Sequence, residues 1–333
     1  MDYRLLGRTG IRVSEICLGT MMFGGRTDEA DSQAIIARAI DAGVNFLDTA
    51  DIYNAGASEE IVGRGIAACR DRVILATKGR NAMGEGPNDS GTSRGYLMRA
   101  LDASLKRMGT DYVDVYYVHS PDYDTPLDET LRALDDMVRS GRVRYVACSN
   151  YRGWYLAKAL SISSQHELER FACVQPLYNI VNRDIEVDLL PLCQDQQIGV
   201  VSYSGLARGI LTGKYTKFGE YPEGSRASLN DPRMTQAELR EASIAVSQRL
   251  VGYCQERGTV CSQFSLAWCL ANPILTSVIV GPRTMEQFED NLGCLDVEWT
   301  DADEELVDSL VPPGEHSGFG FQDSAYPVTG RGR

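Results

Sequence analysis

Four residues with complementary acid and base chemistry lie at or just beyond the ends of short apolar runs: Asp48, Tyr53, Lys78 and His119. A phenol has an unperturbed pKa of about 10, and a neighbouring ammonium group lowers it, so Lys78 is expected to lower the pKa of Tyr53. Asp48 would hold Lys78 charged, and His119 would donate a hydrogen bond to a developing alkoxide. No nucleophilic serine or cysteine and no paired carboxylate accompanies them. This proton-donating site therefore needs electrons from elsewhere, which points to a hydride cofactor.

Each of these residues alone also has a structural explanation, because Asp48 and Lys78 could form a supporting ion pair and His119 could be a satisfied core histidine. Their shared placement at the ends of apolar runs favours a catalytic role for all four. The other apolar runs also close on residues that a hydrophobic core would not select, namely Ser149-Asn150, Gln175, Tyr203 and Gly281. If the runs are the strands of one barrel, all of these side chains meet at its mouth.

The positioning elements are predicted from eight apolar runs that alternate with segments of helical period. The runs are Ile16-Leu18, Asn45-Leu47, Val73-Thr77, Val113-Val118, Tyr145-Cys148, Ala172-Val174, Val200-Ser202 and Val278-Val280. Their near-continuous apolarity suits strands buried on both faces of a parallel sheet. Eight strand-helix units predict an α/β protein with a (β/α)8 TIM barrel, which takes about 250 residues. A doubly wound sheet is the alternative, but the turn Leu18-Gly25 lacks its Gly-x-Gly-x-x-Gly spacing.

The remaining length is assigned to helices and flanking segments. Thr125 is the expected N-cap of one helix, with Pro126 at its first position and Gly141 as its left-handed stop. We expect a hairpin at residues 3–13 that closes the floor of the barrel. A long loop is expected at residues 204–236, after the seventh strand, and a helix and tail at residues 300–333. Residues 1–333 are predicted to form one domain, with the tail 311–333 over the active-site mouth. Helices are expected near residues 34–42, 58–69, 97–108, 126–140, 154–164, 187–196, 237–257, 262–271 and 284–292.

Composition and charge exclude several classes of function. The 33 Lys and Arg against 46 Asp and Glu give a net charge of -13, the wrong sign for a nucleic-acid binder. The chain opens without an apolar signal core and contains no apolar run of about 18 residues, so a cytoplasmic protein with no membrane partner is expected. Its nine cysteines are scattered singly and are expected to be small buried hydrophobes, and its three histidines do not support a metal site.

Seven separated motifs, in order from about Tyr3 to Leu295, resemble the aldo-keto reductases, in the branch with bacterial general reductases and potassium-channel β-subunits. The motifs are Asp48-Thr49-Ala50-Asp51-Ile52-Tyr53, Ala76-Thr77-Lys78, Val118-His119-Ser120-Pro121-Asp122, Cys148-Ser149-Asn150-Tyr151, Val174-Gln175-Pro176-Leu177-Tyr178-Asn179, Leu206-Ala207-Arg208-Gly209-Ile210-Leu211-Thr212-Gly213-Lys214-Tyr215 and Gly281-Pro282-Arg283-Thr284. The resemblance implies that Tyr53 is the general acid and base, with Asp48, Lys78 and His119 as its catalytic partners.

The resemblance also implies a nicotinamide cofactor. A guanidinium at Arg283 suits bidentate bonding to a 2′-phosphate, so NADP(H) is favoured and NAD(H) is the second choice. Gln287 has a rival role in a capping box with Thr284. Ser204-Gly205-Leu206 departs from the family's Ser-Pro-Leu and loosens the loop backbone. The implied cofactor residues are Gly19, Thr20, Met21, Arg26, Asp48, Ser149, Asn150, Gln175, Tyr203, Ser204, Leu206, Arg208, Lys214, Arg226, Gly281, Arg283, Gln287, Asp290 and Asn291.

Aromatic and apolar residues near the expected mouth suggest a moderately apolar or sugar-sized carbonyl substrate, and the acidic surface disfavours highly anionic substrates at long range. Several of these residues have packing as the alternative role. The expected substrate contacts are Met22, Phe23, Tyr53, His119, Tyr123 and Trp154, with Met83 at the rim and Phe319, Phe321 and Tyr326 in the tail.

Three functions compete on this sequence. The first is an NADPH-dependent reductase of aldehydes or ketones, or the same enzyme working as an alcohol dehydrogenase. The second is a cofactor-sensing binding subunit with incidental turnover, which the absence of an extra segment before Tyr3 disfavours. A metal-dependent barrel hydrolase or isomerase fails for want of His and carboxylate ligands. The partner expected is a small carbonyl compound, and the sequence indicates no oligomeric state.

Overall fold

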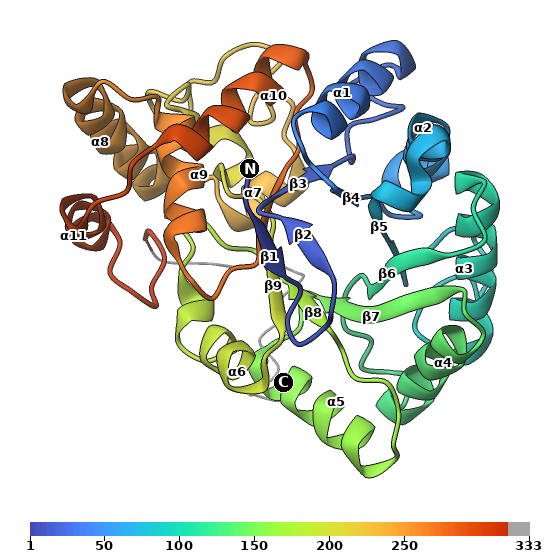
Figure 1. Ribbon diagram of the computed structural model, residues 1–333. Coiled ribbons are helices and arrows are strands. Elements are labelled where there is room, and N and C mark those ends of the chain that lie inside the picture. The colour runs from blue at the N-terminus through green and yellow to red at the C-terminus, as the bar shows by residue number, and fades with distance from the viewer. Residues whose placement is uncertain (319–333) are drawn as a thin grey trace.

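The computed structural model describes residues 1–318 of the 333-residue chain. In this part of the chain, eight parallel strands close into a barrel in chain order, and β10 pairs with β3 to complete the ring (Figure 1). The predicted (β/α)8 barrel is confirmed, and each predicted run overlaps one strand. The strands are β3 Ile16–Gly19, β4 Phe46–Asp48, β5 Ile74–Gly79, β6 Val113–Val118, β7 Val143–Ser149, β8 Cys173–Gln175, β9 Gly199–Ser202 and β10 Ser277–Val280.

Helices surround the barrel, as Figure 1 shows, and their apolar side chains are buried in one cluster with those of the strands. The first helix begins five residues earlier than predicted, because the Asp28 side chain caps it by accepting a hydrogen bond from the Asp31 amide. The helices are α1 Glu29–Asp41, α2 Ala57–Ile66, α3 Arg94–Met108, α4 Leu127–Arg139, α5 Gly153–Gln165, α6 Leu189–Gln196, α7 Pro232–Ala237, α8 Glu241–Arg257, α9 Cys261–Ala271, α10 Met285–Leu292 and α11 Asp301–Leu310. Short 3₁₀ helices occupy Tyr53–Gly56, Ala67–Arg72, Asp184–Glu186, Ala207–Thr212 and Gly293–Asp296.

The predicted hairpin consists of β1 Tyr3–Leu5 and β2 Arg12–Ser14 and lies across one end of the barrel (Figure 1). Leu6 and Val13 are fully buried and pack into the cluster of side chains that fills the barrel interior. Gly7 turns the chain at φ 57°, and a Cβ there would lie 2.6 Å from backbone atoms of Ala172 and Gly199. Only glycine allows this close approach, so the hairpin closes the floor and leaves the other end open for a site.

The start of α4 differs from the prediction. Pro126, not Thr125, is the N-cap residue, and Thr125 donates its hydroxyl hydrogen bond to Asp122 Oδ2 at 2.7 Å instead. The Thr125 side chain is therefore committed to the preceding loop. The predicted left-handed stop is confirmed at Gly141, which has φ 77°.

The segment after the seventh barrel strand is more structured than the predicted loop. It contains a 3₁₀ helix at Ala207–Thr212 and α7, which Asp231 caps by accepting hydrogen bonds from two amides, with Pro232 in the first turn. The helix predicted at 237–257 begins four residues later, as α8 at Glu241, and Ala237 is instead the last residue of α7. Between α7 and α8 the Glu238 side chain is fully buried against Arg208 and Ser204.

All nine cysteine side chains are buried, as expected for small apolar core residues. Among the described residues, no helix has the length and apolarity needed to cross a membrane.

Candidate active site

The carboxyl ends of the parallel strands meet at the open end of the barrel. Asp48, Ser149 and Gln175 are the last residues of their strands, Lys78 is the penultimate residue of β5, and His119 directly follows β6. Tyr203 and Gly281 follow β9 and β10 in the same way. All of these residues except the fully buried Lys78 line a cavity of about 1210 Å³. The cavity exceeds the usual volume of a site for one drug-sized ligand, so it has room for an extended ligand together with a small one.

Lys78 lies at the centre of the predicted acid-base group. Its fully buried ammonium forms an ion pair with Asp48 Oδ1 and donates hydrogen bonds to Thr49 O at 2.8 Å and Tyr53 OH at 3.3 Å. Burial lowers the pKa of Lys78, but the attraction of Asp48 and then Tyr53 outweighs it, so the pKa lies above its usual value. Lys78 is therefore a fixed positive charge in contact with the Tyr53 hydroxyl.

The phenol of Tyr53 remains protonated at neutral pH. Burial raises its pKa, and the opposing effect of Lys78 is smaller, so the net direction is above the usual value of 10.0. Lys78 does lower the pKa of Tyr53, as predicted, but the prediction left out the larger and opposite effect of losing the water around the phenolate. A protonated phenol beside an ammonium group is the form that donates a proton.

The His119 ring lies edge-on to the Tyr53 ring, with centroids 5.8 Å apart and an interplanar angle of 82°. Asn81 Nδ2 lies 3.1 Å from His119 Nδ1. An amide nitrogen only donates, so Nδ1 accepts and the ring proton is on Nε2. Burial, then Lys78, Arg233 and Arg80, hold the pKa of His119 well below 6.5. His119 is accordingly a neutral hydrogen-bond donor beside Tyr53.

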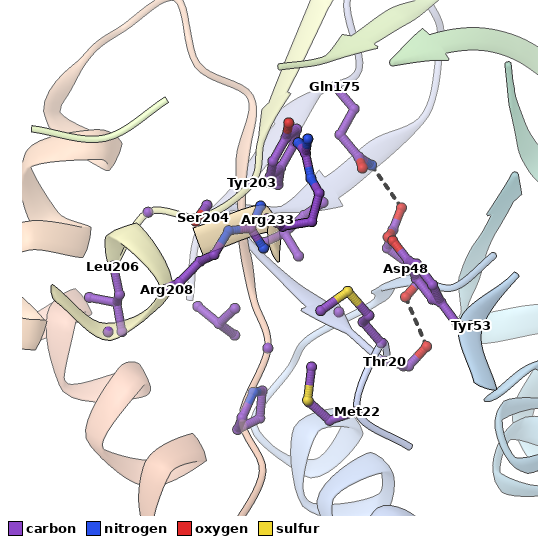
Figure 2. Close-up of a pocket in the computed structure, with 18 of the residues that line it drawn as sticks. Thr20, Met22, Asp48, Tyr53, Gln175, Tyr203, Ser204, Leu206, Arg208 and Arg233 are labelled. Carbon is purple, nitrogen blue, oxygen red and sulfur yellow. Dashed lines mark hydrogen bonds between the residues drawn. The ribbon is translucent and has the colours of Figure 1, made fainter. Parts of the chain in front are cut away.

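Amide and hydroxyl groups form a second network next to Asp48. Gln175 Nε2 donates to Asp48 Oδ2 at 2.8 Å, and on the other side Thr20 donates to the Asp48 backbone oxygen at 3.0 Å (Figure 2). Ser149 Oγ donates to the Gln175 carbonyl at 2.8 Å, and Tyr203 OH donates to Asn150 Oδ1 at 2.7 Å. These bonds fix the orientation of side chains at the ends of five strands, β3, β4, β7, β8 and β9.

Cationic side chains line the opposite part of the cavity, beyond β9 and β10. Lys214, Arg226 and Arg283 lie on its wall, and the pKa of Lys214 is lowered by burial and then by Arg283, Arg226 and Arg26. Within residues 1–318, neither a hydrogen bond nor an ion pair engages the Arg283 guanidinium, whose backbone N–H donates to Gln287 Oε1 at 2.9 Å. Clustered cations that raise one another's energy are a fitting environment for phosphate groups.

Arg208 and Ser204 are held from behind by Glu238. The fully buried carboxylate accepts from Arg208 Nε at 2.8 Å and from Ser204 Oγ at 2.7 Å. Ser204 has φ 62°, and Asn179 Nδ2 also donates to its carbonyl at 2.9 Å. Hydrogen bonds from side chains therefore stabilise the loop around Gly205, where the sequence differs from the family's Ser-Pro-Leu.

Most residues expected to bind a cofactor or substrate lie on the cavity wall, with a few exceptions. Arg26 is not a wall residue, and Phe23 is fully buried in the hydrophobic core, so the packing alternative holds for it. Trp154 is exposed and stacks on Tyr123 at 6.4 Å without lining the cavity, and Met83 is also off the wall. The tail residues Phe319, Phe321 and Tyr326 and most of the tail lie outside the described residues. The expected residues on the wall are Gly19, Thr20, Met21, Met22, Asp48, Tyr53, His119, Tyr123, Ser149, Asn150, Gln175, Tyr203, Ser204, Leu206, Arg208, Lys214, Arg226, Gly281, Arg283, Gln287, Asp290 and Asn291.

Sequence reasoning missed four polar residues at the site: Arg80, Asn81, Arg233 and Glu238. Arg80 and Asn81 follow Lys78 by two and three positions, so their place beyond the end of β5 was a usable signal. Arg233 reaches the wall from α7 and lies near Tyr203 and Arg208 in Figure 2. Nothing in the local sequence marked Glu238. In the part of the chain that the structure describes, no cluster of three potential metal ligands occurs.

Comparison with known proteins extends these observations. The sequence profile of the Aldo/keto reductase family matches residues 15–312. An uncharacterised oxidoreductase of Bacillus subtilis is 38% identical over 326 residues, covering 94% of this chain and 97% of that protein. A probable voltage-gated potassium channel subunit beta of Oryza sativa is 37% identical over 303 residues, 89% of this chain and 92% of that protein. The L-glyceraldehyde 3-phosphate reductase of Escherichia coli is 36% identical over 328 residues, 95% of this chain and 94% of that protein.

Proposed function

The chain belongs to the aldo/keto reductase family, and from this premise we propose that it reduces an aldehyde or ketone to an alcohol with NADPH as cofactor and Tyr53 as general acid. The observation that carries the proposal is the contact of the protonated Tyr53 hydroxyl with the buried Lys78 ammonium, 3.3 Å away, beside the neutral ring of His119. Bound NADPH would supply the hydride.

In this proposal Tyr53 gives its proton to the carbonyl oxygen as that oxygen gains electron density. Lys78 stabilises the phenolate that forms, since its ammonium group is already in place and needs no reorganisation. Asp48 keeps Lys78 charged and oriented, and the Nε2 proton of His119 is the donor available to a second lone pair of the oxygen. In the alcohol-oxidising direction the same residues act in reverse, with Tyr53 accepting the proton.

The cavity wall fits a dinucleotide phosphate. Lys214, Arg208 and Arg226 would hold the pyrophosphate, and Arg283, whose guanidinium is not engaged within residues 1–318, would bind a 2′-phosphate. Ser149, Asn150 and Gln175 present hydroxyl and amide groups suited to a carboxamide, and Tyr203 an aromatic face suited to the ring that carries it. Gly281 leaves open space, because a Cβ there would meet its nearest neighbour only at 3.9 Å.

Titration with NADPH and separately with NADH tests the cofactor assignment, with quenching of the fluorescence of the three tryptophans as the signal. NADPH is expected to bind about tenfold or more tightly, the effect of one charge-assisted contact. Arg283→Ser should weaken NADPH binding and leave NADH binding nearly unchanged. A panel of aldehydes and ketones then tests turnover through loss of NADPH absorbance. Failure to bind either nucleotide would contradict the proposal.

A cofactor-sensing binding subunit is the second candidate, favoured by the 37% identity to the rice channel β-subunit homologue. It predicts nucleotide binding with only trace turnover on every carbonyl compound. Turnover at ordinary enzymatic rates, about one per second or faster, favours the reductase.

A further inference from the structure

Arg80 is a cation in a part of the cavity wall where the cofactor proposal requires none. It lies in the loop after β5, and its neighbours on this wall are Asn81, Ser120, Pro121 and Tyr123 from the loops after β5 and β6. In the ring of strands, β5 and β6 lie across the barrel from β9 and β10, which lead to the phosphate-binding cations. Arg80 therefore belongs to the end of the cavity that remains for the substrate.

Within residues 1–318, the Arg80 guanidinium has neither a hydrogen-bond nor an ion-pair partner. Its Nε atom is buried without a hydrogen-bond acceptor, and no ion pair involves this side chain among the described residues. Other arginines nearby are paired: Arg107 with Glu59 at 2.6 Å and Arg99 with Asp89 at 3.6 Å. A buried donor of a charged group costs free energy when it is left unsatisfied. The wall thus offers a cation with an unsatisfied buried N–H donor to whatever fills this end of the cavity.

The charge of Arg80 also acts on His119, which lies beside the proposed proton donor Tyr53. Burial and Lys78, followed by Arg233 and Arg80, depress the pKa of His119, so both arginines lie within electrostatic range of its ring. Asn81, the next residue, is hydrogen-bonded to that ring. A ligand group bound to Arg80 would consequently leave the rest of a small molecule beside Tyr53 and His119.

The backbone at Arg80 is strained. Arg80 has φ 131°, a conformation that glycine adopts far more easily than arginine. The position therefore carries a large charged side chain where glycine, which has no Cβ, would relieve the strain. The strain by itself identifies no ligand, but it agrees with a side chain retained for contact across the cavity.

We propose that the carbonyl substrate carries an anionic oxygen group, a carboxylate or a phosphate, and that Arg80 binds it while the carbonyl reaches Tyr53 and His119. The inference rests on the proposed reductase function and names the substrate class of that site. The net charge of -13 repels anions at long range. Surface charges more than about 10 Å away are screened by salt, whereas a half-buried guanidinium acts at contact, so the local cation decides binding.

Matched substrate pairs test the proposal on the full-length protein with NADPH. One pair is para-carboxybenzaldehyde and its methyl ester, and the other is glyceraldehyde phosphate and glyceraldehyde, which separates carboxylate from phosphate. The anionic member of at least one pair is expected to have a kcat/KM about tenfold or more higher. Arg80→Met should bring the ratio of kcat/KM for the anionic member to kcat/KM for the neutral member close to one. Arg80→Lys should restore part of this ratio.

Arg99→Met is the matched control, since it removes the same charge from an exposed α3 residue that is absent from the cavity wall. It should leave the ratio unchanged. Equal ratios in the native protein and Arg80→Met would overturn the inference. So would an Arg80→Met variant whose main defect is weaker NADPH binding, because Arg80 would then belong to the cofactor site.

A binding measurement decides the inference without turnover. Para-methylbenzoate and inorganic phosphate, which have no alcohol or carbonyl group to react, are titrated into the protein saturated with NADP⁺, followed by the fluorescence of its tryptophans. Binding of one anion that weakens about tenfold in Arg80→Met supports the inference, and binding of neither overturns it. Reduction of neutral aldehydes alone would leave the proposed function standing and the anion site refuted. No NADPH consumption with any aldehyde would refute the function, while the anion titration would still decide the site.

Discussion

Asp51 is a buried carboxylic acid whose ionisation should oppose folding at neutral and alkaline pH. Its side chain is fully buried behind the site, no side chain within residues 1–318 donates a hydrogen bond to its oxygens, and the Ile52 amide compensates only in part. Burial and then the nearby Glu59 carboxylate raise its pKa from 3.8 to about 7, against the weaker opposing effects of Arg107 and Lys78. The group is therefore protonated in the folded protein at a pH where it is ionised in the unfolded chain.

The sign and size of the effect follow from proton linkage. An acid whose pKa is higher in the folded state favours folding below its unfolded pKa, and this contribution is lost as pH rises through the folded pKa. At about 1.4 kcal/mol per pH unit, the interval from 3.8 to about 7 corresponds to about 4 kcal/mol between pH 4 and pH 8. Asp51→Asn removes the titration, so its free energy of unfolding relative to the native protein should rise by about 3–4 kcal/mol over that interval.

Urea denaturation at pH 4, 6 and 8, followed by tryptophan fluorescence, measures this difference. The amide has its own cost of burial, but that cost does not vary with pH and cancels when values are compared across pH. Asp195→Asn, at an exposed aspartate, is the control. Its free energy of unfolding should differ from that of the native protein by the same amount at all three pH values. A difference between Asp51→Asn and the native protein that stays constant within about 1 kcal/mol from pH 4 to 8 would refute the reasoning.

Two further predictions concern buried ion pairs of the site. Lys78→Met leaves Asp48 buried and unpaired and should cost about 3–5 kcal/mol of unfolding free energy in urea, whereas the double variant with Asp48→Leu should be more stable than Lys78→Met alone. A double variant as unstable as the sum of both single variants would contradict this. Glu238→Gln should lower stability by about 3 kcal/mol because Arg208 loses its charged partner, and a loss below about 0.5 kcal/mol would show that the pair is not buried in solution.

The barrel was predictable because its strands are short, apolar and evenly spaced, and because each ends at a residue that a core would not select. Asp48, Lys78 and His119 could be assigned to one mouth since parallel strands in a closed barrel present all their carboxyl ends together. The structure brings them together with Tyr53 in contact distances that no sequence pattern specifies. Their roles in turnover remain predictions.

The errors arose where side chains act over long sequence distances. The helix predicted at 237–257 begins only at Glu241, because Glu238 turns inward to Arg208, 30 residues earlier, and nothing in the local sequence reveals that contact. The effect of Lys78 on the pKa of Tyr53 was predicted in the right direction, but the net rise was missed because the depth of burial is not readable from the sequence. Asp231-Pro232 was a readable helix start, and it was overlooked within a segment assigned to loop.

The most direct test of the central claim is the effect of Tyr53→Phe on turnover and on cofactor binding, measured with the best aldehyde from the panel. Loss of the phenolic proton donor should lower kcat by about 10²–10⁴-fold. The affinity for NADPH should stay within about twofold, because one uncharged hydroxyl near the nicotinamide contributes little to binding a highly charged dinucleotide. A kcat within a few-fold of the native protein would contradict the account, since the proton would then come from another group.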